Sequence, residues 1–300
     1  MMHQRSLAAV LGTALLAGCG GAATTPAGGA PGQAFSPAVF PAGATARPNA
    51  AKPPKHIYVA SYDSNVVTTY DIGGTQIKPT FSSGVNNPHG IALSGGKLFV
   101  ANSAGGVAAY KAGTGKPTTP TITAGLNFPV GVAAGPGGKI YVSDFLNGTV
   151  TTYTSAGTQT TPTITGLSHP QGLAVDSKGK IYVAESTGVA VFAADGSADF
   201  TITAGLDGPV WVAVDKNDKI YVSNCNQSAS NVTTYSATGT QTSPTISGFA
   251  CPTGIAVDAT GTIYVADYNS SDVTTYSADG TQQALTIDTG LDGPWGVVLH

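Results

Sequence analysis

Polar side chains that could do chemistry recur at one position, directly after short apolar segments of the Ile-Tyr-Val-Ala type. The six residues at this position are Ser61, Asn102, Asp144, Glu185, Asn224 and Asp267. Several oxygen ligands that face one point would suit a hard divalent cation such as Ca²⁺. Such residues also start loops by bonding nearby backbone amides, which is a structural role. We expect no metal or other cofactor, and the alternative is a divalent cation held by Asp144, Glu185 and Asp267.

His89 is the best candidate for acid–base chemistry, because it follows Pro88 at the start of a small apolar segment. The sequence contains no Ser/His/Asp arrangement and no nucleophile elbow. Gly113-Thr114-Gly115-Lys116 lacks the upstream glycine and the following Ser or Thr of a phosphate-binding loop. We therefore expect no catalytic residue, and His89 is the acid/base of an enzymatic alternative.

Five aromatic residues stand close to the same loops and are the predicted ligand-binding residues. Tyr62, Phe145 and Tyr268 lie one place into three of the loops, whereas Trp211 and Trp295 lie near the start of small apolar segments. Rings around an opening can stack on a sugar or a peptide. The alternative, in which the same rings plug the opening and cap the core, stays open at this point.

Cys225 and Cys251 lie in two loops on the same side of the expected fold. Disulfides persist in the oxidising compartments that exported proteins reach. We predict that these two cysteines form a disulfide, and the alternative is a pair of free thiols.

These residues belong to a repeat that is marked by a proline. The marker prolines are spaced 39 to 43 residues apart, at Pro88, Pro129, Pro170, Pro209, Pro252 and Pro294. The clearest copy contains four short strand-like segments, at residues 252–258, 263–267, 273–276 and 285–287. A period of about 40 residues with four strands in each unit is typical of β-propeller blades.

The number of units predicts a closed ring. The first unit begins at its second strand, residues 56–60, and the chain ends with a first strand, residues 295–300. If the last strand completes the first unit, no sheet edge stays open. The sequence therefore predicts an all-β fold, a six-bladed propeller of four-stranded blades closed by the C-terminal strand.

The pattern Pro-x-Gly-Ile-Ala-Val-Asp followed by Ile-Tyr-Val-Ala-Asp, as at residues 252–258 and 263–267, resembles the NHL repeat. The resemblance covers residues 56–300 and departs from the family in the third strand, where the usual basic residue after Asn is missing. It implies the propeller fold but no single function, because NHL-like propellers include binding modules, sensor ectodomains and a few enzymes. Gluconolactonase-like and streptogramin-lyase-like propellers, which resemble this architecture, supply the enzymatic alternative.

The direction of the strands sorts the loops into two faces. If the first strand of each blade runs downward, the loops between second and third strands and the crossovers between blades lie on the upper face. These loops are longer and more varied than the lower turns, so we expect the functional surface on the upper face.

The N-terminal residues indicate export. The apolar segment 7–17 has the length of a signal-peptide core and is shorter than the roughly 20 apolar residues that span a bilayer. It ends in Leu16-Ala17-Gly18-Cys19, which resembles the lipobox of a bacterial lipoprotein. The resemblance implies that residues 1–18 are removed and that a lipid on Cys19 anchors the chain, and Gly20 favours the outer membrane. An ordinary secretory signal is the alternative.

Composition completes the prediction. Residues 19–55 are rich in Ala, Gly and Pro and predict a disordered tether, and residues 56–300 form the propeller. A net charge of −3 without a basic stripe gives no reason to expect a nucleic-acid partner. We expect an exported lipoprotein, periplasmic or at the cell surface, whose propeller binds an envelope protein, peptide or glycan on its upper face. The alternative function is a metal-dependent hydrolase or lyase at the same face.

Overall fold

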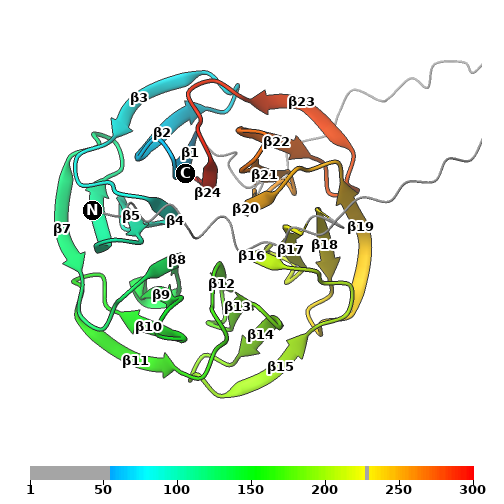
Figure 1. The fold of residues 1–300 in the computed structure, drawn as a ribbon, viewed down its shortest axis with the longest axis horizontal. Helices are drawn as coiled ribbons and strands as arrows, with labels where there is room; N and C mark the ends of the chain where they lie inside the picture. The colour runs from blue at the N-terminus through cyan, green and yellow to red at the C-terminus, as the bar shows by residue number, and fades with distance from the viewer. Residues whose placement is uncertain (1–54, 227–229) are drawn as a thin grey trace, which may run out of the picture. The chain divides into compact units, whose positions relative to one another are not determined.

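The computed structural model describes residues 55–226 and 230–300, which form six four-stranded antiparallel sheets arranged around a central axis (Figure 1). The predicted signal peptide, the predicted lipidation site Cys19 and the tether up to residue 54 lie outside the described residues. One short 3-10 turn, Pro136–Gly138, interrupts the strands of the described part. No helix in that part is long and apolar enough to cross a membrane.

Each blade is one sheet, whose four strands follow one another from the axis outward. Blade 1 contains β24 (Pro294–Leu299), β1 (His56–Ser61), β2 (Val66–Asp71) and β3 (Gln76–Phe81). Blade 2 contains β4 (Pro88–Ser94), β5 (Lys97–Asn102), β6 (Gly106–Lys111) and β7 (Pro117–Ile122). Blade 3 contains β8 (Pro129–Ala134), β9 (Ile140–Asp144), β10 (Thr149–Tyr153) and β11 (Gln159–Ile164).

The other three blades have the same order. Blade 4 contains β12 (Leu173–Val175), β13 (Ile181–Glu185), β14 (Gly188–Phe192) and β15 (Ala198–Ile202). Blade 5 contains β16 (Pro209–Val214), β17 (Ile220–Asn224), β18 (Asn231–Tyr235) and β19 (Gln241–Ser247). Blade 6 contains β20 (Pro252–Val257), β21 (Ile263–Asp267), β22 (Asp272–Tyr276) and β23 (Gln282–Ile287).

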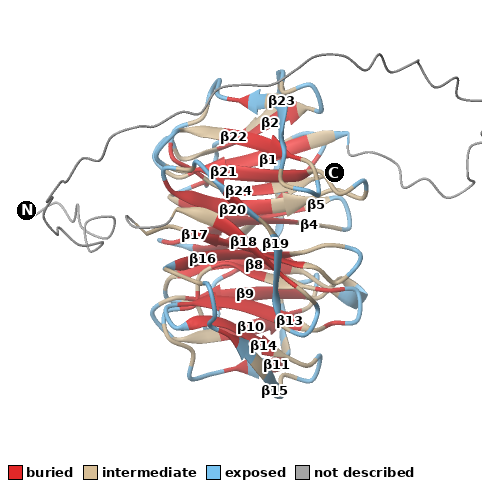
Figure 2. Ribbon diagram, turned by 90° about the vertical axis from the view of Figure 1, so that its right-hand side faces the viewer, coloured by how far each residue is buried: buried red, intermediate tan, exposed pale blue. Residues whose placement is uncertain are grey.

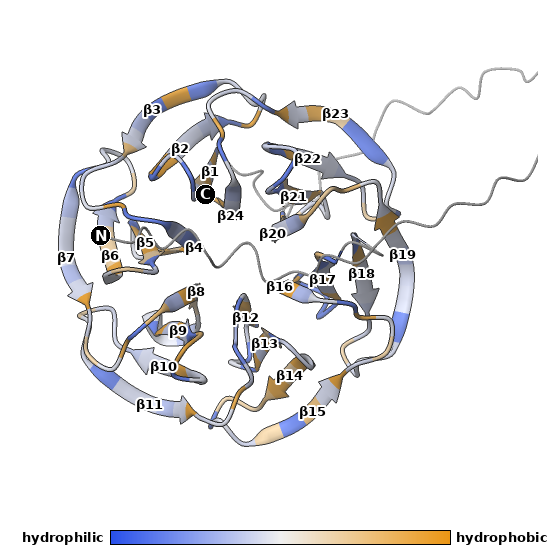
Figure 3. Ribbon diagram, in the orientation of Figure 1, coloured by the Kyte–Doolittle hydropathy of each residue, from blue (hydrophilic) through white to orange (hydrophobic). Residues whose placement is uncertain are grey.

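The second strand of each blade is the most buried, as its apolar sequence predicts. Every residue of β9, β13, β17 and β21 is buried. Figure 2 shows buried residues in the strands inside each blade and exposed ones in the loops and in the outermost strands, such as β15 and β23. The outermost strands form the rim of the ring and carry hydrophilic segments (Figure 3). Prolines enter this rim in β7, β11 and β19, where the lack of a backbone donor matters least.

The C-terminal strand closes the ring, which confirms the prediction. β24 pairs antiparallel with β1, and Ile57 lies opposite Leu299 and Val59 opposite Val297. The backbone amide of His300 also donates to the carbonyl of His56, with an N–O distance of 2.9 Å. Blade 1 is thus made from both ends of the propeller sequence, so the ring leaves no blade incomplete.

Neighbouring blades approach each other most closely at glycines of the innermost strands. A Cβ atom built on Gly90 would lie 2.7 Å from the backbone nitrogen of Val132 in the next blade. Gly131, Gly172, Gly254 and Gly296 are similarly tight against the blade that follows. The Gly of the marker sequence therefore allows six inner strands to share a narrow axis, because any side chain there would meet backbone.

Blade 5 departs from this rule, because Trp211 stands where the other blades have glycine. Its indole ring lies against Gly172 of blade 4, at 2.5 Å from a Cβ built on that residue. In blade 4 the first strand starts only at Leu173, three residues after the marker Pro170, and the amide of Gly172 donates to the carbonyl of Val210 in blade 5. Blades 4 and 5 are therefore joined at the axis in a different way from the others.

Candidate functional site

The upper face is the one that carries the B–C loops and the crossovers between blades, where B and C denote the second and third strands of a blade. The six polar residues that end the second strands lie on this face, and they hold these loops. Both carboxylate oxygens of Asp144 accept backbone N–H groups of the preceding crossover, Oδ2 from Asn127 at 2.5 Å and Oδ1 from Phe128 at 3.2 Å. Asp267 accepts in the same way from Ala250 and Cys251, at 2.7 and 2.8 Å.

The other members of the set have the same role with fewer bonds. Glu185 accepts from the amide of Ser168 at 2.7 Å, Asn224 from Asp207 at 3.1 Å, and Asn102 from Asn86 at 3.0 Å. Ser61 is too short for this bond, and its buried Oγ has no hydrogen-bond partner. Apart from Ser61, each of these side chains holds the crossover that leads into its own blade.

The predicted alternative metal ligands Asp144, Glu185 and Asp267 are not brought together. In residues 55–226 and 230–300, no three His, Cys, Asp or Glu side chains are grouped so that they could hold a metal ion. The oxygens of Asp144 and Asp267 are already engaged by backbone amides, so this donor set does not fit a divalent cation.

Aromatic side chains do come together on the upper face. Tyr62, Tyr268 and Trp295 form a triangle at the junction of blades 6 and 1, with ring centroids 5.5 Å apart for Tyr268 and Trp295, 6.0 Å for Tyr62 and Trp295, and 6.5 Å for the two tyrosines. His89 of blade 2 packs on this triangle, at 4.8 Å from Tyr62 and 4.7 Å from Trp295. The three rings of the triangle are each partly exposed.

The ring contacts continue through blades 2 and 3 around the mouth, by which we mean the upper end of the central axis. His89 lies 6.0 Å from Phe128, Phe128 lies 6.0 Å from Phe145, and Phe145 lies 4.7 Å from His169. Leu146, next to Phe145, is 57% exposed and extends the apolar surface. We call the seven connected rings the aromatic arc; they are Tyr62, His89, Phe128, Phe145, His169, Tyr268 and Trp295.

His89 is a neutral, fixed member of the arc. The residue is only 6% exposed, and burial lowers the pKa of its imidazole to about 4. Its Nδ1 lies 3.2 Å from the carbonyl oxygen of Asn87, so the neutral ring carries its proton on Nδ1 and donates it to that oxygen. His89 therefore adds no positive charge to the mouth at neutral pH.

A carboxylate adjoins the triangle. The hydroxyl of Tyr268 donates to Oδ2 of Asp63 at 2.9 Å, and the backbone amide of Asp63 donates to the carbonyl of Asp292 at 3.3 Å. Burial raises the pKa of Tyr268, and the hydrogen bond to Asp63 and the negative charges of Asp63 and Asp292 raise it further. Asp63 and Asp292 are both exposed. The triangle is thus bordered by two solvent-facing carboxylates.

The sequence of blade 6 identifies the repeat. Residues 249–276, which cover the whole of β20, β21 and β22, match the family model of the NHL repeat. The chain is an NHL-repeat-like six-bladed β-propeller. A search of curated proteins finds no match to this NHL-like propeller.

Solved structures share the fold of this NHL-like propeller at low sequence identity. A nidogen/laminin complex contains a chain with a TM-score of 0.68 and 13% identity, over 81% of this chain and 97% of that one. A protein of unknown function from Bacteroides caccae gives a TM-score of 0.64 and 11% identity, over 82% and 98%. A catalytically inactive histidine-to-alanine variant of virginiamycin B lyase from Staphylococcus aureus, with quinupristin, gives 0.61 and 13%, over 82% and 91%. These likenesses establish the fold alone.

Four of the five aromatic residues predicted from the sequence lie in the arc, and Trp211 does not. Trp211 is 5% exposed and belongs to the core cluster that contains Ala213 and Ile255. It occupies the position of the ring glycines, whose Cβ direction points at the neighbouring blade and not into the mouth. Tyr62, Phe145, Tyr268 and Trp295 are therefore the predicted residues that the NHL-like propeller places at a surface.

Cys225 and Cys251 form a disulfide, with their Cα atoms 4.7 Å apart. The bridge joins the B–C loop of blade 5 to the crossover into blade 6. The amide of Cys225 donates to the carbonyl of Gly208, and the carbonyl of Cys251 accepts from Tyr268 at 3.0 Å in each case. This half of the mouth is thus fixed by a covalent bond next to blade 6.

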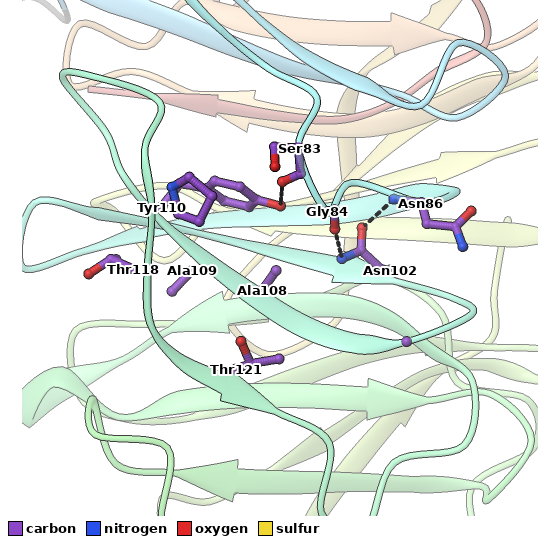
Figure 4. Close-up of a pocket in the computed structure, with 11 residues that line it drawn as sticks. Ser83, Gly84, Asn86, Asn102, Ala108, Ala109, Tyr110, Thr118 and Thr121 are labelled. Atoms are coloured by element: carbon purple, nitrogen blue, oxygen red, sulfur yellow. Dashed lines mark hydrogen bonds between the residues drawn. The ribbon is translucent and has the colours of Figure 1, made fainter.

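A hollow of about 450 Å³ lies beside β6 in blade 2, apart from the aromatic arc (Figure 4). Its floor contains Ala108 and Ala109, where blades 1, 3, 5 and 6 have two threonines. The amide of Asn102 donates to Gly84 at 3.2 Å and the hydroxyl of Tyr110 to Ser83 at 3.0 Å. The hollow therefore follows from two smaller side chains, and no charged residue lines it to orient a ligand.

The residues of the site that sequence reasoning missed are Asp63, Phe128, Leu146 and His169. Phe128 and His169 each precede a marker proline, a position that holds Asn87, Gly208, Cys251 and Gly293 in the other blades. A comparison of this position across the repeat would have shown the two rings. Only the structure shows that both rings contact Phe145.

Proposed function

We propose that the NHL-like propeller is a non-catalytic binding module that holds a partner on the upper face, against the aromatic arc. The observation that carries the proposal is the arc itself, a connected set of rings that crosses four blades and in which every ring except the buried His89 is at least partly exposed. Aromatic residues contribute large contact areas at interfaces and have few torsions to fix on binding.

The neighbouring residues support this proposal. Leu146 is one of two large apolar side chains that are exposed in the described part of the chain, and it adjoins the arc. The likeness to a propeller solved within a nidogen/laminin complex also supports a protein-binding role. The partner we propose is an envelope protein, peptide or glycan.

The test compares two exposed side chains on opposite faces. Leu146 lies beside the arc, whereas Ile72, which is 47% exposed, follows β2 on the lower face. Immobilised full chain should retain a partner from an envelope extract. The variants Phe145→Ala and Leu146→Ala should each retain at least tenfold less of that partner. Ile72→Ala is the matched control and should retain the partner. Equal retention by all variants would rule out the arc as the binding surface.

We propose further that a lipid on Cys19 anchors the module in the envelope, with the outer membrane as the preferred site. The lipobox resemblance of Leu16-Ala17-Gly18-Cys19 supports this location. Radiolabelled palmitate should enter the full chain and should not enter the Cys19→Ala variant. Label that persists in the variant would contradict the anchor.

A second candidate function is a hydrolase or lyase, and His89 is the observation that favours it. The side chain is held as one neutral tautomer at the mouth, with Nε2 as the acceptor atom. The likeness to virginiamycin B lyase supports this candidate at the level of fold. If the full chain opens lactone or ester substrates, and His89→Gln abolishes turnover without affecting partner retention, the enzymatic function is the correct one.

A further inference from the structure

The two faces of the propeller differ in charge. All lysines of residues 55–300 lie on the lower turns or on the strand residues next to them. They are Lys55, Lys78, Lys97, Lys111, Lys116, Lys139, Lys178, Lys180, Lys216 and Lys219. The same stretch contains no arginine. The upper face of the described residues therefore carries no permanent positive charge.

The carboxylates are divided evenly between the faces. Those of the upper loops and strand ends are Asp63, Asp144, Glu185, Asp207, Asp267, Asp272, Asp288 and Asp292. On the lower face acidic residues meet lysines, as in the ion pairs Lys178–Asp218 at 2.6 Å and Lys180–Asp199 at 2.7 Å. Among the described residues, the upper face includes no lysine or arginine that could form such a pair with its carboxylates.

The rings and the charge meet at the triangle of Tyr62, Tyr268 and Trp295. Asp63 accepts a hydrogen bond from Tyr268 with one oxygen, and its backbone contacts Asp292. Cations are attracted to the faces of Trp and Tyr rings, and a carboxylate strengthens their binding. An anionic ligand would meet the same carboxylates and be repelled. A neutral glycan would use the rings and could donate hydroxyl hydrogen bonds to Asp63 and Asp292, but it would gain no charge pairing and no long-range attraction to this face.

We propose that the partner docks on the triangle through a cationic peptide segment, whose Lys or Arg side chains lie over the rings of Tyr62, Tyr268 and Trp295 and pair with Asp63 and Asp292. This inference rests on the proposed binding function and specifies the chemistry of the partner. The unneutralised negative charge of the upper face would also steer such a segment to the mouth, so that its association slows as salt is added.

Trp295 provides a direct signal for the test. The chain has two tryptophans, and Trp211 is only 5% exposed, in a core cluster against which Trp295 packs. In a Trp211→Phe background of the full chain, fluorescence reports Trp295 alone. Hexalysine and hexaarginine should change this fluorescence in a saturable way, and hexaglutamate should not. Isothermal titration of the unmodified chain gives the dissociation constant independently.

The decisive variants change the same net charge on opposite faces. Asp63→Asn with Asp292→Asn should weaken binding of hexaarginine at least tenfold. The matched control, Asp199→Asn with Asp218→Asn on the lower face, should change it less than twofold. Replacing Tyr62 by Leu should weaken binding by a similar factor to the upper pair, since it removes a ring and leaves both carboxylates.

Three results with the full chain would overturn the inference: no saturable binding of either cationic peptide, equal weakening by the upper and lower charge variants, or a neutral oligosaccharide that binds the triangle unaffected by the upper variant. In each case, a partner retained from extract that still depends on Phe145 and Leu146 would leave the proposed binding function intact. Cationic binding that appears only when residues 20–54 are deleted would assign the site to Arg47 and Lys52 of the chain's own N-terminal segment, and would also overturn the inference.

Discussion

The two halves of the upper mouth are built from the same repeat and are held in different ways. In blades 6, 1, 2 and 3 the mouth is bordered by the aromatic arc, whose rings contact one another and, apart from the buried His89, stay at least partly exposed. On the side of blades 4 and 5, Trp211 is buried against Gly172 and the Cys225–Cys251 disulfide fixes the loops. One half places its aromatic residues at a surface, and the other places its large aromatic residue in the core.

This difference shows how a symmetric fold obtains a directional site. The strands repeat closely, so each blade offers the same scaffold positions. The residues that differ most between the blades at the mouth lie directly after the marker proline, directly before it and in the B–C loops. Substitutions there change the mouth without changing the strands. The comparison predicts that changes in the two halves separate stability from binding.

The largest effect should come from removing the strand that belongs to both the ring and the arc. Deletion of residues 295–300 removes most of β24, exposes the edge of β1 and takes Trp295 out of the triangle. We expect loss of cooperative unfolding, measured by circular dichroism during thermal denaturation. A truncated chain that melts like the full one would contradict ring closure by β24.

A smaller loss of stability should follow when either tryptophan is replaced by alanine. Trp211→Ala leaves a cavity in a core and should lower the free energy of unfolding by about 4 kcal/mol. Trp295→Ala should cost about half as much, because its ring is partly exposed. Urea denaturation measures both. If Trp295→Ala were the more destabilising variant, the assignment of the two rings to surface and core would be reversed.

The disulfide should stabilise its half of the mouth by a comparable amount. The bridge closes a chain segment with a sequence separation of 26 residues, and loop-closure entropy for that length corresponds to about 3 kcal/mol. The double variant Cys225→Ala, Cys251→Ala should lose this amount in urea denaturation and should still retain the partner. Loss of partner retention in a folded double variant would place the binding surface on this half as well.

The smallest effect should be the pH dependence of His89. Its pKa is about 4 in the folded protein and about 6.5 in an unfolded chain. Between these two pKa values the imidazole of the unfolded chain is protonated, whereas that of the folded chain stays neutral. The contribution of His89 to the free energy of unfolding is therefore present above pH 6.5 and is lost as the pH falls toward 4. At pH 5 the loss should be about 2 kcal/mol.

The variant His89→Gln is the control for that measurement. It removes the ring contacts at every pH, so it should be less stable than the native chain at pH 8. Because glutamine cannot take up the proton, the difference in free energy of unfolding between the variant and the native chain should be about 2 kcal/mol smaller at pH 5 than at pH 8. Parallel stability curves for the two proteins would mean that His89 is not held neutral by burial.

The fold could be predicted from the sequence because its determinants are local and repeated. Each strand shows its burial in a few residues, as in Ile263–Asp267, and each marker proline starts a new blade or lies just before it. The ring closure followed from a missing first strand at one end and an extra one at the other. Because the pattern repeats, the strands assigned in one blade could be checked against those of the other blades.

The site could be predicted only in part, because it depends on contacts between blades. Phe128 and His169 occupy a position where the other blades have unrelated residues, so no pattern indicates that they meet Phe145. Trp211 was expected at the mouth because it lies one residue after the position of Trp295. That single step turns the side chain to the neighbouring blade, since successive residues of a strand face opposite sides.

The placement of every lysine of residues 55–300 on one face makes the propeller an electric dipole along its own axis. A dipole turns in a field, so a domain of this kind does not meet a charged surface in random orientations. Beside an anionic layer, such as a phospholipid leaflet or a negatively charged polysaccharide, the lower turns face the layer. The aromatic arc then faces the opposite direction, toward whatever approaches from solution.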